Sequence, residues 1–220
     1  MRIVMTWRRT LLVALLPIAL IAELVIASVL VNAAPRTAQA PLSIAVVGDS
    51  YSAGRYNRVV WPTLLAERTG WSVANFAQPG SGFVADGQGG HAFTYQVDRA
   101  QGTHSRIVLI VGGIADAGLW DKTRIGISFI DATNKTKLDG QRVLVVGPTW
   151  YETPVPDDVR HVSAAISDAA QQAGVPFLDA LDPPWLTVAQ MRDDLSGPTD
   201  EGQSVIADRI AAWVRTEVGR

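Results

Sequence analysis

The sequence predicts one doubly wound α/β sandwich around a parallel sheet of about five strands. From residue 42 onward, apolar runs of strand length alternate with segments of helix length, which is typical of successive βαβ units. The runs at 106–113 and 142–148 are almost continuously apolar, as strands covered on both faces should be. The chain has 220 residues, of which 48% are hydrophobic, so it is long enough for one sizeable core and short for two.

The expected elements follow one another in regular order. Strands are expected at 42–48, 71–77, 106–113, 142–148 and 175–180. Helices are expected at 59–69, 91–101, 121–138, 157–173 and 199–218. Gly70 and Gly174 follow two of these helices, and glycine favours the left-handed conformation in which helices commonly end. Thr199 is the expected N-cap of the last helix, whose first turn carries acidic residues that suit the helix dipole.

The N-terminal segment differs in kind from the rest of the chain. Arginines at positions 2, 8 and 9 precede an apolar run at 11–31 that only Glu23 and Ser28 interrupt. This length suits a membrane span, and the arginines favour an N-terminus left in the cytoplasm. We interpret 1–31 as a transmembrane anchor and 32–41 as a linker. The domain at 42–220 is then exported and held at the cell membrane.

A cleaved signal peptide is the alternative for this segment. Glu23 lies in the middle of the apolar run, where a carboxylate costs a few kcal/mol in a bilayer. The sequence TAQA at 37–40 offers a small-x-small cleavage site, which would leave the domain secreted. The pair Arg8-Arg9 is weakly similar to a twin-arginine signal.

Composition excludes several classes of function. The net charge of −2 leaves no basic surface typical of nucleic-acid binding, so no nucleic-acid partner is expected. The chain has no cysteine, which excludes disulfides, thiol catalysis and zinc–thiolate sites. With three histidines and no HExxH spacing, no metal site is expected, and no cofactor either.

The segment SIAVVGDSYSAG at 43–54 contains the main candidate for chemistry. Its apolar, β-branched run ends in Gly-Asp-Ser, so a buried strand would deliver Ser50 to the carboxyl edge of the sheet. Open parallel sheets carry their sites at this edge. Ser50 is therefore a candidate nucleophile. The alternative is a turn serine that satisfies backbone groups at the end of a strand.

Four blocks resemble the SGNH, or GDSL, hydrolase family over roughly residues 42–217. GDSYSAG at 48–54 is similar to the first block, and NFAQPG at 75–80 to the second. GGIAD at 112–116 takes the place of the family's Gly-x-Asn-Asp, and DLSGP at 194–198 that of its Asp-x-x-His-Pro. The resemblance implies a flavodoxin-like three-layer α/β/α sandwich and the hydrolysis of esters.

The resemblance also assigns roles to residues of this chain. It implies that Ser50 is the nucleophile and that Asp194 stands at the position of the triad acid. It implies an oxyanion hole formed by the amides of Ser50 and Gly80, although Gly80 could serve only as a turn glycine. Asp116 is expected to be structural and to bond to nearby amides.

Two positions depart from the family pattern. Ala115 stands where the family has the oxyanion-hole asparagine, and Gly197 stands where it has the histidine base; no histidine follows His161. A serine hydroxyl is a poor nucleophile without a base, and loss of the histidine removes several orders of magnitude in rate. Loss of one oxyanion donor costs about 10²–10³ in turnover. The two losses together predict a degenerate active site.

These observations lead to two main hypotheses, beside a third in which the domain is a purely structural module of the cell envelope and the site is unused. The first is an inactive or very weak hydrolase-like domain, a pseudoenzyme that binds an acylated glycan, a lipid or another ester. The second is an active serine esterase, acylhydrolase or acyl transferase in which Asp194 or His91 replaces the missing base. His91, His104 and His161 are otherwise expected to be structural. Among the aromatic residues that follow strand ends, Trp120, Trp150, Tyr151 and Trp185 either line a ligand groove or pack in the core.

Overall fold

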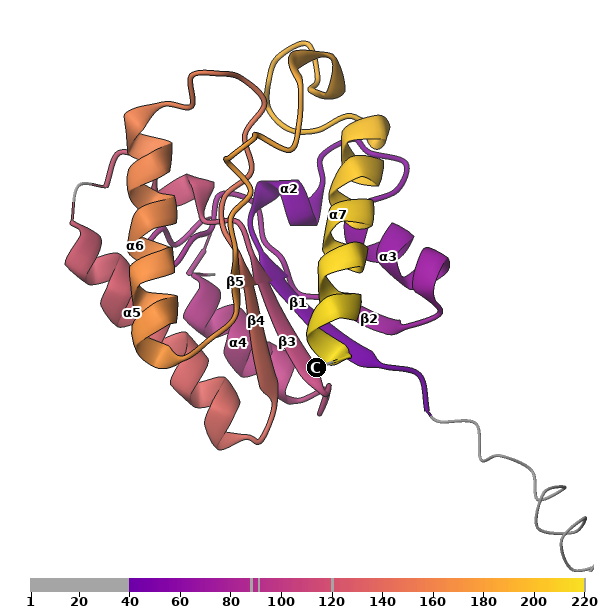
Figure 1. Cartoon of the computed structure of the whole chain (residues 1–220), viewed down its shortest axis with the longest axis vertical. Coiled ribbons are helices and arrows are strands. Elements are labelled where there is room, and N and C mark those ends of the chain that lie inside the picture. The colour runs from indigo at the N-terminus through magenta and orange to yellow at the C-terminus, as the bar shows by residue number, and fades with distance from the viewer. Residues whose placement is uncertain (1–39, 88, 91, 120, 220) are drawn as a thin grey trace, which may run out of the picture. The chain divides into compact units, whose positions relative to one another are not determined.

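The computed structural model describes residues 40–219 except 88, 91 and 120 (Figure 1). Its single five-stranded sheet has the order β2-β1-β3-β4-β5, and all neighbouring strands are parallel. The strands are β1 (Ser43–Gly48), β2 (Ser72–Asn75), β3 (Ile107–Val111), β4 (Arg142–Val146) and β5 (Phe177–Leu178). The predicted fold class and the predicted number of strands are therefore confirmed.

Five long helices connect or follow these strands, as predicted. They are α3 (Trp61–Thr69), α4 (Phe93–Gln101), α5 (Lys122–Leu138), α6 (Asp157–Ala173) and α7 (Asp200–Val218). Gly70 and Gly174 end α3 and α6 in the left-handed conformation, and the Thr199 hydroxyl accepts from the Gly202 amide to cap α7. Three short elements were not predicted: α2 (Ser50–Ala53), and the 3-10 helices η1 (Ile114–Asp116) and η2 (Val188–Gln190).

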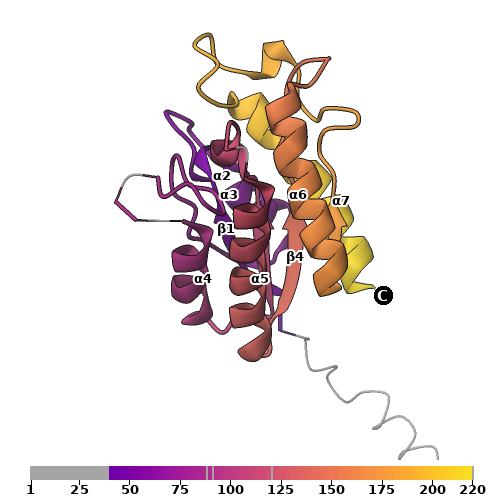
Figure 2. The same cartoon turned by 90° about the vertical axis from the view of Figure 1, so that its left-hand side faces the viewer.

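The helices cover both faces of the sheet (Figures 1 and 2). Helices α3 and α7 pack on one face over the apolar side chains of β1, β3 and β4, including Ile44, Leu109 and Leu144. Helices α4, α5 and α6 pack on the other face, where Phe93 and Phe129 are fully buried. Because alternate side chains of a strand point to opposite faces, the almost continuous apolar runs supply both cores.

The fifth strand is shorter than predicted. The apolar stretch at 175–180 forms a ladder only over Phe177 and Leu178, at the edge of the sheet. Asp179 then ends the strand, because its carboxylate accepts from the Ser163 hydroxyl (3.2 Å) and from the Leu181 amide (3.2 Å). At the edge of the sheet, β5 has β4 as its one partner strand, so its length is set by the ladder with β4 alone.

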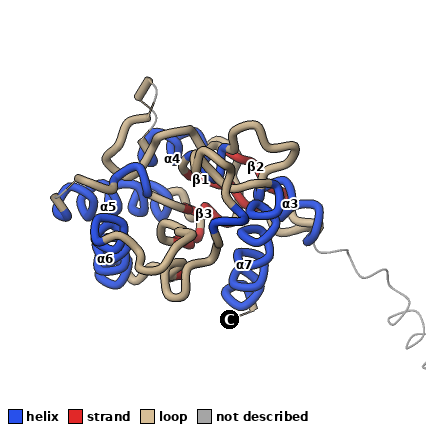
Figure 3. Tube along the Cα trace, turned by 90° about the horizontal axis from the view of Figure 1, so that it is seen from above, coloured by secondary structure: helices blue, strands red, loops and turns tan. Residues whose placement is uncertain are grey.

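The strand order positions the site. The chain runs from β1 outward to β2 on one side, and from β3 outward to β5 on the other, so the direction of winding reverses between β1 and β3. Seen from above in Figure 3, the helices lie on either side of the central strands. Ser50 follows β1 and η1 follows β3, so the segments that carry Ser50 and Ala115 meet at this switch point.

The predicted anchor at 1–31 and the linker up to residue 39 lie outside the described residues. Between Ala40 and Gly219, in the part of the chain that the structure describes, no helix is long and apolar enough to cross a membrane.

Candidate active site

Ser50 is the first residue of the short helix α2, directly after β1. Asp49 is the N-cap of this helix, and its side chain accepts from the Tyr51 amide at 3.0 Å. The Ser50 amide is the first N–H of a helix and so has no partner within the helix. The strand and its turn therefore present a half-buried serine together with an available amide.

Gly80 lies against the Ser50 hydroxyl. The Gly80 amide donates to Ser50 Oγ at 2.8 Å, although the two residues are thirty positions apart. Gly80 has a φ of 71°, a left-handed conformation that favours glycine. The structure thus brings together the two residues predicted for the oxyanion hole, and an oxyanion on a carbonyl attacked by Ser50 would form beside both amides.

The Asp49 carboxylate joins the turn after β1 to the turn after β3. It is buried, and its Oδ2 atom accepts from the amides of Gly113 (3.0 Å) and Ile114 (3.4 Å). Burial raises the pKa of Asp49 from its ordinary 3.8 to about 6, against the lowering effect of these amides. Gly112 is required beside it, because a Cβ at this position would collide with the carboxylate. The sequence reasoning assigned no role to Asp49.

Asp116 has the structural role predicted for it. Its carboxylate is fully buried and accepts from three consecutive amides, those of Phe83 (2.7 Å), Val84 (3.1 Å) and Ala85 (2.7 Å). Burial raises its pKa, and the three amides oppose the change. The loop that follows Gly80 is therefore fixed to η1.

Ala115 is the middle residue of η1, between the carboxylate anchors. Its side chain is a methyl group, which donates no hydrogen bond. The backbone around it is held by Asp49 and Asp116, so η1 is tied both to the turn after β1 and to the loop after Gly80.

A buried glutamine, which the sequence reasoning missed, fixes the end of β1. Gln96 of α4 accepts from the Gly48 amide at 2.9 Å and donates to the Gly48 carbonyl at 3.1 Å. Its Nε2 atom also donates to Ser81 Oγ at 2.8 Å, next to Gly80. A polar residue on the buried face of a predicted amphipathic helix was the available signal, because such a residue needs hydrogen-bond partners.

In the C-terminal block at 194–198, the acidic side chain is exposed, unlike those of Asp49 and Asp116. Asp194 is exposed, and its Oδ1 atom accepts from the amide (3.0 Å) and the hydroxyl (2.6 Å) of Ser196. These two bonds, together with the charges of Arg192 and Arg55, hold the pKa of Asp194 below its ordinary value. The carboxylate is therefore engaged within its own loop.

Gly197 lies in the same loop, and its carbonyl accepts from the Arg192 amide at 3.0 Å. Its φ is not in the left-handed region, and a Cβ built there would meet no heavy atom within 4 Å. The backbone at this position thus has room for a Cβ atom, although the glycine itself is buried.

The C-terminal block nevertheless lies next to the nucleophile segment. Asn57 donates to the Pro198 carbonyl at 3.0 Å and to Asp200 Oδ1 at 3.1 Å. Gln203 of α7 is buried, donates to the Tyr51 carbonyl at 2.9 Å and accepts from the Trp61 amide at 2.8 Å. These bonds join the start of α7 to α2 and α3.

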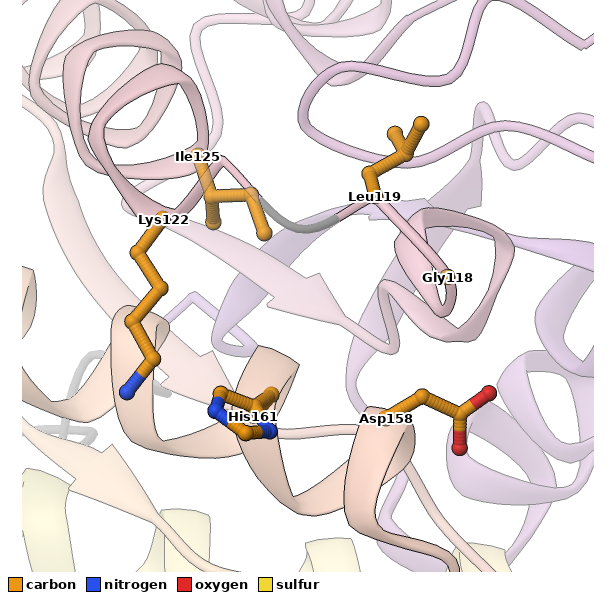
Figure 4. Close-up of a pocket in the computed structure, with 6 residues that line it drawn as sticks. All are labelled: Gly118, Leu119, Lys122, Ile125, Asp158 and His161. Atoms are coloured by element: carbon orange, nitrogen blue, oxygen red, sulfur yellow. The ribbon is translucent and has the colours of Figure 1, made fainter.

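Neither described histidine bonds to Ser50. His161 Nδ1 lies 2.9 Å from the carbonyl of Asp157 in the same helix, and His104 lies in the turn after α4. In Figure 4, His161 lines a small pocket with Lys122 of α5, Asp158 of α6 and the loop residues Gly118 and Leu119. His91 lies outside the described residues. Within those residues, Ser50 Oγ has the Gly80 amide as its one hydrogen-bond partner, and no base accepts its proton.

The described aromatic residues after the strand ends are buried or half-buried and pack against the core. Trp185 is buried in the core under α7. Trp150 and Tyr151 follow β4 and stack with their ring centroids 4.5 Å apart. The Trp150 indole N–H is buried and has no hydrogen-bond partner among the described residues. Trp120 lies outside the described residues. The same part of the chain holds no group of three or more acidic or histidine side chains that could bind a metal ion.

The sequence model of the GDSL-like lipase/acylhydrolase family matches residues 46–205, which include Ser50, Gly80, Ala115, Asp194 and Gly197. The chain belongs to this family. None of the curated proteins compared with this GDSL-like chain matches its sequence.

Solved structures share the fold of this family member at low sequence identity. The psychrotrophic esterase EstA from Pseudoalteromonas sp. is 16% identical, with a TM-score of 0.62 over 80% of this chain and 98% of that chain. TesA is 18% identical, with a TM-score of 0.64 over 77% of this chain and 95% of that chain. A carbohydrate esterase of family 3 from Talaromyces cellulolyticus is 19% identical, with a TM-score of 0.60 over 81% and 98%.

Proposed function

We propose that this domain binds an ester ligand at the Ser50 site and hydrolyses it very slowly or not at all. The observation that carries the proposal is the state of the Ser50 hydroxyl. It accepts from the Gly80 amide at 2.8 Å, and no described base accepts its proton. The amide donates to the oxygen and removes no proton from it, whereas a serine hydroxyl is activated when an adjacent base takes its proton.

The C-terminal block supports the same conclusion. In the family, Asp194 would orient a histidine at position 197, but here the carboxylate bonds to Ser196 and position 197 is glycine. A carboxylate with a lowered pKa is a weak base for a serine hydroxyl. With Ala115 in place of the asparagine, the site has lost both its base and one oxyanion donor.

The ligand class is proposed from the family and its neighbours. The similar structures include carbohydrate esterases and the acetyl xylan esterase AlAXEase. We infer that the ligand is an acylated glycan or a lipid. We also infer that an anchor at 1–31 holds the domain at the outer face of the membrane. Cell fractionation together with sequencing of the mature N-terminus would test the export and the anchor. Recovery of the full chain in the cytosol would contradict both.

An active esterase or acyl transferase is the second candidate. The observation in its favour is the intact pairing of Ser50 with Gly80, since an oxyanion hole and binding alone retain some catalysis. It requires a substitute base, either Asp194 after release from Ser196 or His91.

Hydrolysis of 4-nitrophenyl acetate separates the two candidates. We expect no turnover above that of the Ser50→Ala variant, and no labelling of Ser50 by a fluorophosphonate probe. Turnover that disappears in Ser50→Ala would contradict the proposal and establish the active alternative. Asp194→Ala and His91→Ala would then identify the base.

Restoring the missing groups tests whether the scaffold is otherwise competent. Gly197→His together with Ala115→Asn should raise turnover by about 10²-fold or more, since a base and an oxyanion donor each contribute this much elsewhere. Gly197→Gln with Ala115→Asn is the matched control, because it adds a side chain of similar size without a base. Ser196→Ala, added to the histidine variant, should free Asp194 to orient the new imidazole and raise turnover further.

A further inference from the structure

Two loops meet beside α2, the short helix that begins at Ser50. The loop at 54–60 follows α2, and the loop at 191–199 is the C-terminal block. Asn57 joins them through its bonds to the Pro198 carbonyl and to Asp200. The Arg58 amide adds a third bond, to Asp200 Oδ1 at 3.1 Å. The surface that these two loops form is therefore assembled before any ligand arrives.

Both loops contribute an arginine to one tyrosine ring. The guanidinium carbon of Arg55 lies 5.2 Å from the centroid of the Tyr56 ring, and that of Arg192 also lies 5.2 Å from it. Tyr56 is 75% exposed, so its ring is not held there by burial in the core. The negative faces of an aromatic ring attract guanidinium groups, so the Tyr56 ring binds one arginine from each loop. We name these three residues the arginine–tyrosine cluster.

The cluster has donors without acceptors. Arg192 Nε is enclosed and has no hydrogen-bond partner among the described residues. Its neighbouring carboxylate oxygen, Asp194 Oδ1, is 4.0 Å away, and that oxygen already accepts two bonds from Ser196. The Arg55 guanidinium makes no hydrogen bond or ion pair with any other residue in the described part of the chain. An enclosed, unpaired N–H is unfavourable unless a ligand or water accepts from it.

We propose that the arginine–tyrosine cluster binds an oxyanion, a phosphate or carboxylate group, carried by the ligand of the Ser50 site. This inference rests on the proposed function, in that it takes the Ser50 site to hold a ligand. Arg55 follows α2, the helix that begins at Ser50, and Arg192 belongs to the loop that carries Gly197, so the two arginines come from the two segments that adjoin the proposed site in the chain. Guanidinium groups are suited to this role, because their planar N–H pairs match the oxygens of phosphate and carboxylate groups.

Asp194 would compete with a ligand oxyanion for the guanidinium groups of the arginine–tyrosine cluster. It is the carboxylate next to Arg192, and the charges of both arginines act on it. A ligand oxyanion would have to share the guanidinium groups with Asp194 or displace it. Removal of the Asp194 charge should therefore strengthen oxyanion binding, whereas a cluster with a merely structural role would show no such gain.

The test is calorimetric titration of the full chain in a non-ionic detergent with soluble probes. Inorganic phosphate, glucuronate and glycerophosphoglycerol represent a free phosphate, an acidic sugar and a lipid headgroup, and glucose is the neutral control. We expect saturable binding of at least one anion and none of glucose. The anion that binds most tightly identifies the source. Failure of all three anions to bind would overturn the proposal.

Variants assign any binding to the cluster. Arg55→Gln and Arg192→Gln should each weaken anion binding by about 10-fold, as expected for loss of a charge-assisted hydrogen bond. Arg192→Lys should recover only part of the loss, because it restores the charge without the planar fork. Asp194→Asn should strengthen binding about 3-fold or more, by removal of a charge a few ångströms away. Equal affinity in the wild type and both glutamine variants would contradict the assignment.

Arg106→Gln is the matched control for loss of one positive charge. Arg106 is exposed and directly precedes β3, at the end of the sheet opposite the Ser50 site. The Arg106→Gln variant should therefore bind the anion with the same affinity as the wild type. Thermal unfolding of each variant shows whether it has folded. Failure of this proposal is distinguishable from failure of the proposed function, because the latter is measured with 4-nitrophenyl acetate, a neutral ester.

Discussion

The site has two halves that are built in opposite ways. Around Ser50 and η1, buried polar side chains fix the backbone: Asp49, Gln96 and Asp116 satisfy amides of the turn after β3, of β1 and of the loop after Gly80. At the C-terminal block, Asp194 is exposed and bonds within its own loop, and Gly197 has open space where a side chain would be. The half around Ser50 is held by buried side chains, whereas the acidic side chain of the C-terminal block is exposed and bonds only within its own loop.

This difference indicates that the residues that hold the backbone at the site are not the residues that would react or bind a ligand. The Asp49 and Asp116 carboxylates serve the backbone, so they are needed for folding whether or not Ser50 reacts. Asp194 and its neighbours would serve only the reaction or a ligand. Substitutions in the two halves should therefore have very different effects on stability.

The largest difference is expected between two aspartates. Asp116→Ala should lower the free energy of unfolding by about 4 kcal/mol, because it leaves one buried and two partly buried amides without an acceptor. Asp194→Ala, its matched control in the exposed half, should leave the urea midpoint unchanged within error. Equal effects of the two substitutions in urea unfolding would show that the halves are not organised as described.

Two glycines give the next comparison. Gly112 has a φ of 110°, and a Cβ there would collide with the Asp49 carboxylate. Gly112→Ala should therefore cost about 3 kcal/mol or more, as the sum of backbone strain and a displaced buried group. A circular-dichroism melting curve would check this, and an unchanged midpoint would mean that the turn after β3 adapts easily.

The pH dependence of stability tests the buried carboxylate itself. The pKa of Asp49 in the folded protein is about 6, above its ordinary 3.8, so the folded state holds the proton more tightly than the unfolded state does. Stability from this group is fully present below pH 3.8 and is lost as the pH rises to about 6. The difference amounts to up to about 3 kcal/mol.

The raised pKa of Asp116 acts in the same direction. Urea unfolding between pH 4 and pH 7 should show the decline in the wild type and a flatter profile in Asp49→Asn. A wild-type profile that rises over this range would contradict the assignment.

The smallest effect on stability is expected at Gly197. Gly197→Ala should change the free energy of unfolding by less than about 0.5 kcal/mol, because its Cβ meets no atom within 4 Å. A loss comparable with that of Gly112→Ala would mean that the open space closes in solution. Such a result would also remove the basis for restoring a histidine there.

Much of the fold could be predicted from the sequence alone. The continuous apolar runs of β3 and β4 and the glycines that end α3 and α6 are local signals, and they placed the main elements within a few residues. The short helices α2, η1 and η2 were missed, because one turn has too few residues to show a period. The edge strand β5 was predicted too long, because its length depends on the ladder with β4.

The candidate site could be predicted only in part. The order of the blocks placed Ser50, Gly80 and Ala115 along the chain, and the absence of a histidine after His161 is itself a fact of the sequence. The bond from Gly80 to Ser50 spans thirty residues, and that from Asn57 to Pro198 spans 141, so no local pattern reveals either.

The sequence by itself determined which chemical groups this protein has at its site and which it lacks, since composition and order do not depend on folding. The tertiary structure alone decided what the remaining groups do. It turned Asp49 and Asp116 toward backbone amides, Asp194 toward Ser196, and Arg55 and Arg192 toward one tyrosine ring. The physical reason is that a hydrogen bond depends on distance and direction in space, which the packing of the helices on the sheet sets.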